Sequence, residues 1–170
     1  MDGVVMSLPT FRESAERNFD DLDADGDGFL TRYDYMALAQ QRLQRTGVRP
    51  DTPDGEAVID AFLNAWDTHA RALDTDRDGR ISKEEYVRSF EILVRTGALE
   101  AVLAPISRAT FTLADRDGDG RISSEEFRSL WSRPGTDLAT VFAEADTDGD
   151  GRISFEEFAR ARHGLLIGGA

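Results

Sequence analysis

The chain contains no cysteine among its 170 residues. This absence excludes disulfide bonds, zinc sites built on thiolates and a cysteine nucleophile. The chain also has no apolar run of the roughly 18 residues that a membrane-spanning helix needs. Lysine is nearly absent as well, since Lys83 is the only lysine among 20 basic residues. Such a preference for arginine is typical of a GC-rich genome, and we therefore expect a bacterial source.

The charge of the chain is strongly one-sided. Asp and Glu number 33 against 20 Lys and Arg, which gives a formal net charge of −13. This charge repels phosphate backbones and anionic bilayers, so we expect neither nucleic acid nor membrane as a partner. Hydrophobic residues make up 40% of the chain, which argues against global disorder. The first residues show no basic stretch followed by an apolar core, and this favours a cytoplasmic protein.

The acidic residues are concentrated in four segments that align without gaps. Each segment has Asp at positions 1, 3 and 5, Gly at position 6, Leu or Ile at position 8, Ser or Thr at position 9 and an acidic residue at position 12. Their first residues lie 51, 41 and 31 residues apart, so units of constant length are separated by variable spacers. We call them loops 1 to 4: Asp23–Asp34, Asp74–Glu85, Asp115–Glu126 and Asp146–Glu157.

Three carboxylates at alternate positions of a short loop repel one another. Two such charges about 4 Å apart repel by roughly 4 kcal/mol at an effective dielectric constant near 20. Repeated in four loops, this repulsion is strongly destabilising unless a cation lies among the carboxylates. Hard oxygen ligands in this number suit Ca²⁺, which takes about 6–8 oxygens, or Mg²⁺, which requires a stricter octahedron of about six.

Each loop offers oxygen atoms at six positions. Carboxylates at positions 1, 3, 5 and 12, a backbone carbonyl at position 7 and a water held by the hydroxyl at position 9 can surround one ion, while the glycine at position 6 allows the sharp turn. The predicted metal ligands of loops 1 and 2 are Asp23, Asp25, Asp27, Phe29, Thr31, Asp34, Asp74, Asp76, Asp78, Arg80, Ser82 and Glu85. Those of loops 3 and 4 are Asp115, Asp117, Asp119, Arg121, Ser123, Glu126, Asp146, Asp148, Asp150, Arg152, Ser154 and Glu157.

The same residues also have a purely structural interpretation. Ser at position 9 followed by Glu at position 12 is the capping box of a helix N-terminus, and Asp-Gly pairs are common in turns. The two interpretations are compatible, because the hydroxyl can cap the helix while the carboxylate binds the ion. Four repeats in register favour the metal site.

The loops resemble EF-hand calcium-binding loops, whose pattern is D-x-[DN]-x-[DN]-G-x₅-E. In all four loops the residues quoted above match this pattern, except that loop 1 ends in Asp34. The apolar residues at position 8 should join neighbouring loops by antiparallel pairing, Leu30 with Ile81 and Ile122 with Ile153.

The segments between the loops have the apolar periodicity of helices. A long helix over Asp54–Leu73 should lead into loop 2. We expect a short turn over Leu99–Leu103 and then a helix that begins at Pro105. The predicted fold is all-α, with two paired EF-hand lobes packed into one compact globule. The first pair occupies residues 1–97, and the second pair, which ends in an apolar tail, occupies residues 98–170.

Helix lengths and composition make the chain similar to the sarcoplasmic calcium-binding proteins and their bacterial calerythrin-like relatives, which are compact four-hand buffers. The three Met and ten Phe of the chain favour a filled core over a methionine-rich groove. The resemblance implies a Ca²⁺ buffer. The alternative is a Ca²⁺ sensor that regulates a protein partner through a Ca²⁺-exposed apolar groove. We expect a monomer, and no arrangement of residues indicates an enzyme.

Loop 1 departs from the other loops at position 12. Asp34 is one methylene shorter than Glu and is expected to supply one oxygen rather than two, which favours Mg²⁺ over Ca²⁺. The sequence therefore predicts three strong Ca²⁺ sites, in loops 2–4, and a weaker or mixed Ca²⁺/Mg²⁺ site in loop 1.

Two further interpretations concern isolated residues. His69 and His163 are expected to be solvated or packed residues, with no catalytic or metal-binding role. Gly164 is expected to end the last helix. Leu165–Ile167 would then form either a frayed end or an apolar plug that covers the groove of an opened lobe.

Overall fold

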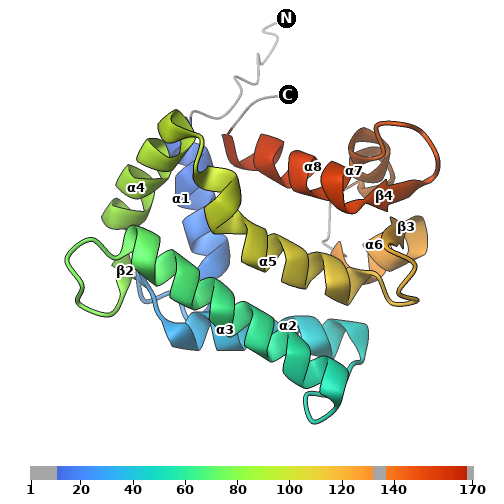
Figure 1. Ribbon diagram of the computed structural model, residues 1–170, viewed down its shortest axis with the longest axis horizontal. Helices are drawn as coiled ribbons and strands as arrows, with labels where there is room; N and C mark the ends of the chain where they lie inside the picture. The colour runs from blue at the N-terminus through green and yellow to red at the C-terminus, as the bar shows by residue number, and fades with distance from the viewer. Residues whose placement is uncertain (1–10, 132–136, 168–170) are drawn as a thin grey trace, which may run out of the picture.

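The structure is a computed structural model that describes residues 11–131 and 137–167, with side chains described up to residue 162. Its first half contains α1 (Phe11–Leu22), β1 (Phe29–Leu30), α2 (Arg32–Thr46), α3 (Pro53–Leu73), β2 (Ile81–Ser82) and α4 (Lys83–Thr96). Its second half contains α5 (Leu99–Ala114), β3 (Arg121–Ser123), α6 (Ser124–Trp131), α7 (Leu138–Ala145), β4 (Arg152–Ser154) and α8 (Phe155–Ile167). Figure 1 shows this all-α arrangement, which confirms the predicted fold class.

The helices begin and end where the sequence supplies caps. Thr31 caps α2 and Ser82 caps α4, in each case through a complete capping box with the acidic residue at position 12 of the loop. Gly47 and Gly97 end these two helices with φ near 72°, a left-handed conformation that glycine adopts without steric cost. The long helix α3 starts at Pro53, next to the predicted Asp54.

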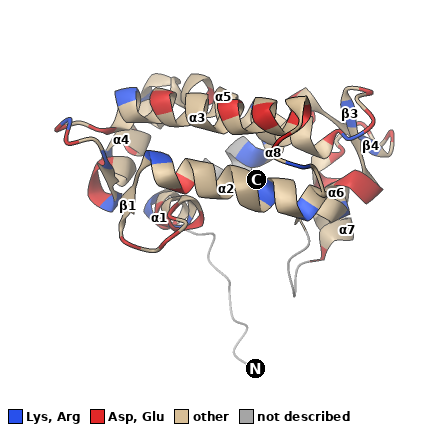
Figure 2. Cartoon of the chain, turned by 90° about the horizontal axis from the view of Figure 1, so that it is seen from below, with Lys and Arg blue, Asp and Glu red and all other residues tan. Residues whose placement is uncertain are grey.

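Two short antiparallel sheets join the loops in pairs. Leu30 lies opposite Ile81 and Ile122 lies opposite Ile153, as the sequence predicted. All four side chains are fully buried beneath the loops. The two sheets lie at opposite ends of the molecule, with β1 and β2 at one end and β3 and β4 at the other (Figures 1 and 2).

The two halves of the chain share one hydrophobic core. Helix α3 packs along α5, α1 packs against α8, and α2 contacts α6. Phe62 of α3 and Ile106 of α5 are both fully buried. Each half therefore covers the apolar helix faces of the other, which gives the single globule that the sequence predicted.

One boundary prediction was wrong. The structure has no turn over Leu99–Leu103 and no helix start at Pro105, because α5 runs unbroken through both, with Pro105 inside it. A proline inside a helix costs about 3 kcal/mol. Leu99, Leu103 and Ile106 are all buried on this helix, and each contributes about 1.5–3 kcal/mol. Packing therefore outweighs the hydrogen bond that the proline removes.

The prediction for the end of the chain was also wrong. Helix α8 passes through Gly164 and continues to Ile167. The helix packs against α1 and α5, so tertiary contacts hold it beyond a residue with poor helix propensity. The side chains of Leu165–Ile167 lie outside the described residues. No described helix is both long and apolar enough to cross a membrane.

His69 joins three helices in the middle of the core. Its side chain is fully buried, its Nε2 lies 3.1 Å from the Val102 carbonyl of α5, and its Nδ1 is hydrogen-bonded to the Tyr35 hydroxyl of α2. A carbonyl can only accept, so Nε2 carries the proton and Nδ1 accepts from Tyr35. Burial and the positive charge of Arg162 lower the pKa of His69 to about 4. His69 is thus a packed residue, one of the two outcomes that the sequence allowed.

Buried His69 predicts an acid-sensitive fold. The native state keeps this histidine neutral down to about pH 4, whereas the unfolded chain binds a proton below its ordinary pKa of 6.5. The free energy of unfolding is therefore complete above pH 6.5 and falls toward pH 4, by at most about 1.4 kcal/mol per pH unit. His69→Gln should flatten this slope in ion-free buffer, measured by urea unfolding at several pH values. His163→Gln is the control and should keep the slope, so equal slopes in both variants would contradict the prediction.

Candidate metal centres

Each loop is anchored to the helix that precedes it. The backbone N–H of position 1 donates to a carbonyl in the last helical turn, at 2.9 Å in loops 1, 3 and 4 and at 3.1 Å in loop 2. The four donors are Asp23, Asp74, Asp115 and Asp146. The ends of α1, α3, α5 and α7 therefore fix the first carboxylate of each predicted site.

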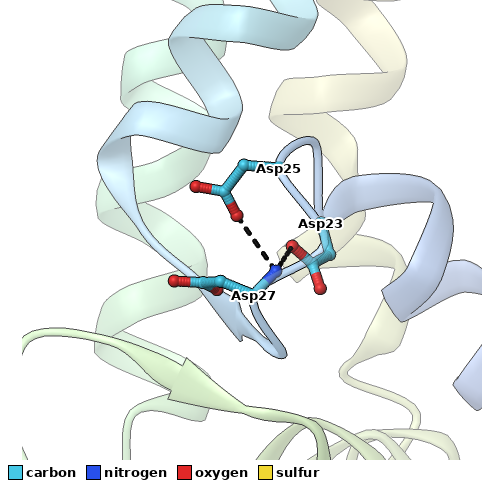
Figure 3. Close-up of side chains that lie close together, drawn as sticks. All are labelled: Asp23, Asp25 and Asp27. Atoms are coloured by element: carbon cyan, nitrogen blue, oxygen red, sulfur yellow. Dashed lines mark hydrogen bonds between the residues drawn. The ribbon is translucent and has the colours of Figure 1, made fainter.

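Within each loop, the carboxylates accept N–H groups from the residues that follow. Position 1 accepts the N–H of the position 6 glycine at 2.9 Å in loops 1, 3 and 4 and at 3.1 Å in loop 2. In loop 1 the N–H of Asp27 donates to both Asp23 and Asp25, at 3.2 Å and 3.1 Å (Figure 3). These bonds wrap the backbone around a centre that the acidic side chains face.

The carboxylates gather into four clusters of three, one in each loop. In every cluster, one oxygen from each residue lies within 4.8 Å of the others. Loops 2–4 contribute positions 1, 3 and 12, whereas loop 1 contributes positions 1, 3 and 5. The clusters are Asp74, Asp76 and Glu85; Asp115, Asp117 and Glu126; Asp146, Asp148 and Glu157; and Asp23, Asp25 and Asp27.

The glutamates at position 12 close their loops by hydrogen bonds to both ends. Glu85 accepts the N–H groups of Thr75 at 3.1 Å and Ser82 at 2.9 Å, together with both hydroxyls. Burial raises the pKa of Glu85, but the bonds from Ser82 and Thr75 outweigh it and lower the pKa to about 2. Bonds from Ser154 and Thr147 likewise lower the pKa of Glu157 to about 2. These carboxylates are charged ligands at neutral pH.

Asp34 closes loop 1 in the same way despite its shorter side chain. Its carboxylate accepts the N–H of Ala24 at 3.0 Å and that of Thr31 at 2.7 Å, and the residue is 1% exposed. A bond from the Asp27 N–H lowers the pKa of Asp25, yet burial and the charges of Asp27, Asp34 and Asp23 together raise it. The carboxylates of loop 1 thus repel one another strongly enough to oppose ionisation.

The donor sets fit a hard divalent cation. Every cluster consists of carboxylate oxygens alone, which suits Ca²⁺ or Mg²⁺. In loop 2, Oδ1 of Asp74 is buried and accepts no hydrogen bond within the described part of the chain. A buried carboxylate oxygen without a partner is costly, and a bound cation would remove this cost. The bound ion would supply positive charge among the carboxylates, which the loop backbone and position 12 hold in place.

Comparison with known protein families decides the identity of these loops. A model described as an EF-hand domain pair matches residues 12–91, 70–132 and 104–161. The chain belongs to the EF-hand family.

Among curated relatives, this EF-hand chain is similar to calerythrin of Saccharopolyspora erythraea, with 28% identity over 137 residues that cover 79% of this chain and 77% of calerythrin. It is also similar to human calcineurin B type 2, with 31% identity over 132 residues that cover 67% of this chain and 78% of that protein. The predicted resemblance to the calerythrin-like group is confirmed.

Solved structures share the whole fold. A Streptomyces coelicolor calcium-binding protein, solved in a study of prokaryotic calcium-mediated regulation, is 26% identical with a TM-score of 0.76, over 94% of this chain and 99% of that one. The sarcoplasmic calcium-binding protein from amphioxus is 19% identical with a TM-score of 0.72, over 94% of this chain and 91% of that one. The latter similarity shows the fold alone.

In this EF-hand protein, the residues at positions 7 and 9 do more than the sequence indicated. The position 9 hydroxyls donate to the position 12 carboxylates, at 2.8 Å in loops 1–3 and 2.9 Å in loop 4, so capping and closing of the loop use one group. The arginines at position 7, interpreted as carbonyl ligands alone, also use their side chains: Arg80, Arg121 and Arg152 each pair with an aspartate at position 5.

Loop 2 has a strained residue that the sequence analysis missed. Arg77 occupies position 4 with φ of 61°, where the other loops have glycine with φ near 72°. This left-handed conformation costs a non-glycine residue roughly 1–2 kcal/mol. The signal was present in the aligned loops, since Gly26, Gly118 and Gly149 occupy position 4 elsewhere.

The strain at Arg77 predicts a stabilising substitution. Arg77→Gly removes the steric cost but gives the unfolded chain more freedom, so the free energy of unfolding should rise by about 0.5–1 kcal/mol. The reciprocal change Gly118→Arg in loop 3 should lower it by a similar amount. Urea unfolding in ion-free buffer measures both, and a fall in stability for Arg77→Gly would contradict the assignment.

Proposed function

We propose that the protein is an intracellular Ca²⁺ buffer or transporter, which binds the ion without opening toward a partner. The observation that carries this proposal is the mutual burial of the two EF-hand pairs, residues 1–97 and 98–170. An EF-hand sensor must expose an apolar groove when it binds Ca²⁺, whereas a buffer barely opens.

The contacts between the pairs support a closed molecule. Packing of α3 on α5 and of α1 on α8 covers the apolar faces that a sensor would expose. Opening either pair would expose side chains such as Phe62, Ile106 and Phe158, which are 0%, 0% and 7% exposed. Among the described residues the exposed large apolar side chains are Tyr33 and Ile92, on different helices.

We propose that all 24 predicted oxygen donors are metal ligands, with strong Ca²⁺ sites in loops 2–4 and a weaker or mixed Ca²⁺/Mg²⁺ site in loop 1. The composition of the clusters supports this order. Position 12 belongs to the cluster in loops 2–4, whereas in loop 1 Asp34 does not and Asp27 does. A shorter carboxylate that is held by Ala24 and Thr31 favours one-oxygen binding, and a lower number of ligands favours Mg²⁺.

A Ca²⁺ sensor is the second candidate function. Calcineurin B is by its full name one subunit of an assembly, and the Streptomyces coelicolor protein was studied for calcium-mediated regulation. Both relatives share the EF-hand pairs of this chain. In this case a protein partner would have to compete with the contacts between α1 and α8 or between α3 and α5.

The remaining proposals concern the setting of the protein. We propose a monomer without enzymatic activity in the cytoplasm of a bacterium. The relatives are calcium-binding EF-hand proteins, and the arginine-rich composition and the resemblance to calerythrin support a bacterial source. The net charge of −13 argues against nucleic-acid and membrane partners.

The order of the sites is tested by changing the length of one side chain. Asp34→Glu restores the carboxylate length of the other loops, so it should raise Ca²⁺ affinity at loop 1 and weaken competition by Mg²⁺. Calorimetric titration with Ca²⁺, with and without millimolar Mg²⁺, measures site number and ion preference together. Glu85→Asp in loop 2 is the matched control and should produce the opposite change. Four equal wild-type sites that Mg²⁺ does not affect would refute this order.

The choice between buffer and sensor is tested with an apolar fluorescent dye. A buffer should bind the dye no more strongly with Ca²⁺ than without it, whereas a sensor should bind it only with Ca²⁺. Ala161→Glu places a charge on the packed face of α8 and should release this helix, so that dye binding appears in the variant. Strong Ca²⁺-dependent dye binding by the wild type would reject the buffer and support the sensor.

A further inference from the structure

The position 7 arginines of the second EF-hand pair reach across to the neighbouring loop. Arg121 of loop 3 donates from Nη1 to Oδ2 of Asp150 in loop 4. Arg152 of loop 4 donates from Nη1 to Oδ2 of Asp119 in loop 3. The antiparallel pairing of β3 with β4 makes the two contacts reciprocal, since each runs from position 7 of one loop to position 5 of the other.

Backbone bonds close these contacts into a ring. Oδ1 of Asp119 accepts the N–H of Arg121 at 2.9 Å, and Oδ1 of Asp150 accepts the N–H of Arg152 at 2.9 Å. Each aspartate is therefore held by one oxygen in its own loop and by the other oxygen in the neighbouring loop. We call this set of four residues the Arg–Asp ring.

The first EF-hand pair has a different arrangement. Phe29 occupies position 7 of loop 1, and its ring lies 4.2 Å from the guanidinium carbon of Arg80 in loop 2. Arg80 pairs with Asp78 of its own loop, at 2.9 Å from Nε to the carboxylate. Because phenylalanine cannot donate to a carboxylate, the reciprocal arrangement is impossible in this pair.

We propose that the Arg–Asp ring couples Ca²⁺ binding at loop 3 to Ca²⁺ binding at loop 4. The inference rests on the ligand assignment of the proposed function, in which position 5 gives a carboxylate and position 7 gives a backbone carbonyl. An ion that fixes Asp119 and the Arg121 carbonyl in loop 3 also fixes the side chain that orients Asp150 in loop 4. The reverse holds for an ion in loop 4, so each ion prepares a ligand for the other.

The expected coupling is modest. The four ring side chains are 34–48% exposed, and exposed ion pairs have small energies. Removing the ring should therefore reduce the coupling about three- to fivefold. Each arginine also places a positive charge beside the neighbouring ion, so its removal raises the Ca²⁺ attraction of both sites. The coupling between the sites, and not their affinity, is thus the quantity that reports on the ring.

The coupling is measured by comparing loop 4 with loop 3 filled and with loop 3 disabled. Glu126→Gln removes the position 12 carboxylate of loop 3, and calorimetric titration then gives the Ca²⁺ affinity of loop 4 alone. The ratio of the loop 4 affinities in the two backgrounds is the coupling factor. The double variant Arg121→Met, Arg152→Met should have a coupling factor about three- to fivefold smaller than the wild type. Hydrogen exchange of the ion-free protein should also show weaker protection of the β3 and β4 amides.

Two controls separate the ring from a general effect of charge. Arg116→Met removes one positive charge from an exposed position of loop 3 outside the ring and should leave the coupling factor unchanged. Arg80→Met removes the position 7 arginine of the other pair and should also leave it unchanged. An unaltered factor in the double variant, or an equal fall in Arg116→Met, would overturn the inference. If Glu126→Gln removes no site, the ligand assignment itself fails.

Discussion

Repulsion between carboxylates held around one point is the constraint on which this architecture depends. Each loop places three carboxylates within 4.8 Å of one another. The backbone meets this charge with N–H groups, which reach position 1 from the turn and position 12 from both ends of the loop. The helices, the glycine turns and the paired strands all serve to present these donors. A divalent cation at the same point would satisfy the remaining oxygens, among them the buried Oδ1 of Asp74.

Sequence reasoning succeeded where a local rule determines the structure. Fixed spacing of the aspartates predicted the clusters in all four loops, and the lone apolar residue at position 8 predicted the strand pairing of Leu30 with Ile81. The capping residues Thr31 and Ser82 correctly indicated where α2 and α4 begin. In each case the physical cause lies within about twelve residues of the chain, so the pattern is visible in the sequence.

The features that the sequence did not predict depend on residues far apart in the chain. Pro105 and Gly164 suggested helix boundaries, but contacts of α5 and α8 with other helices keep both helices continuous. The reciprocal contacts of Arg121 and Arg152 depend on the register of two strands that are separated by a helix pair. Burial of His69 between Tyr35 and Val102 likewise requires knowledge of how α2, α3 and α5 pack. Local patterns contain no information about such distances.

The core shared by the two halves also bears on how the protein is degraded. Proteases cleave segments that open locally, and a chain with two independent lobes could lose one lobe while the other stays folded. Here α3 packs on α5 and α1 packs on α8, so neither half can open without exposing the interior of the other. Ions bound at one end of the molecule therefore protect peptide bonds at the opposite end, and partial loading is enough to slow turnover of the whole chain.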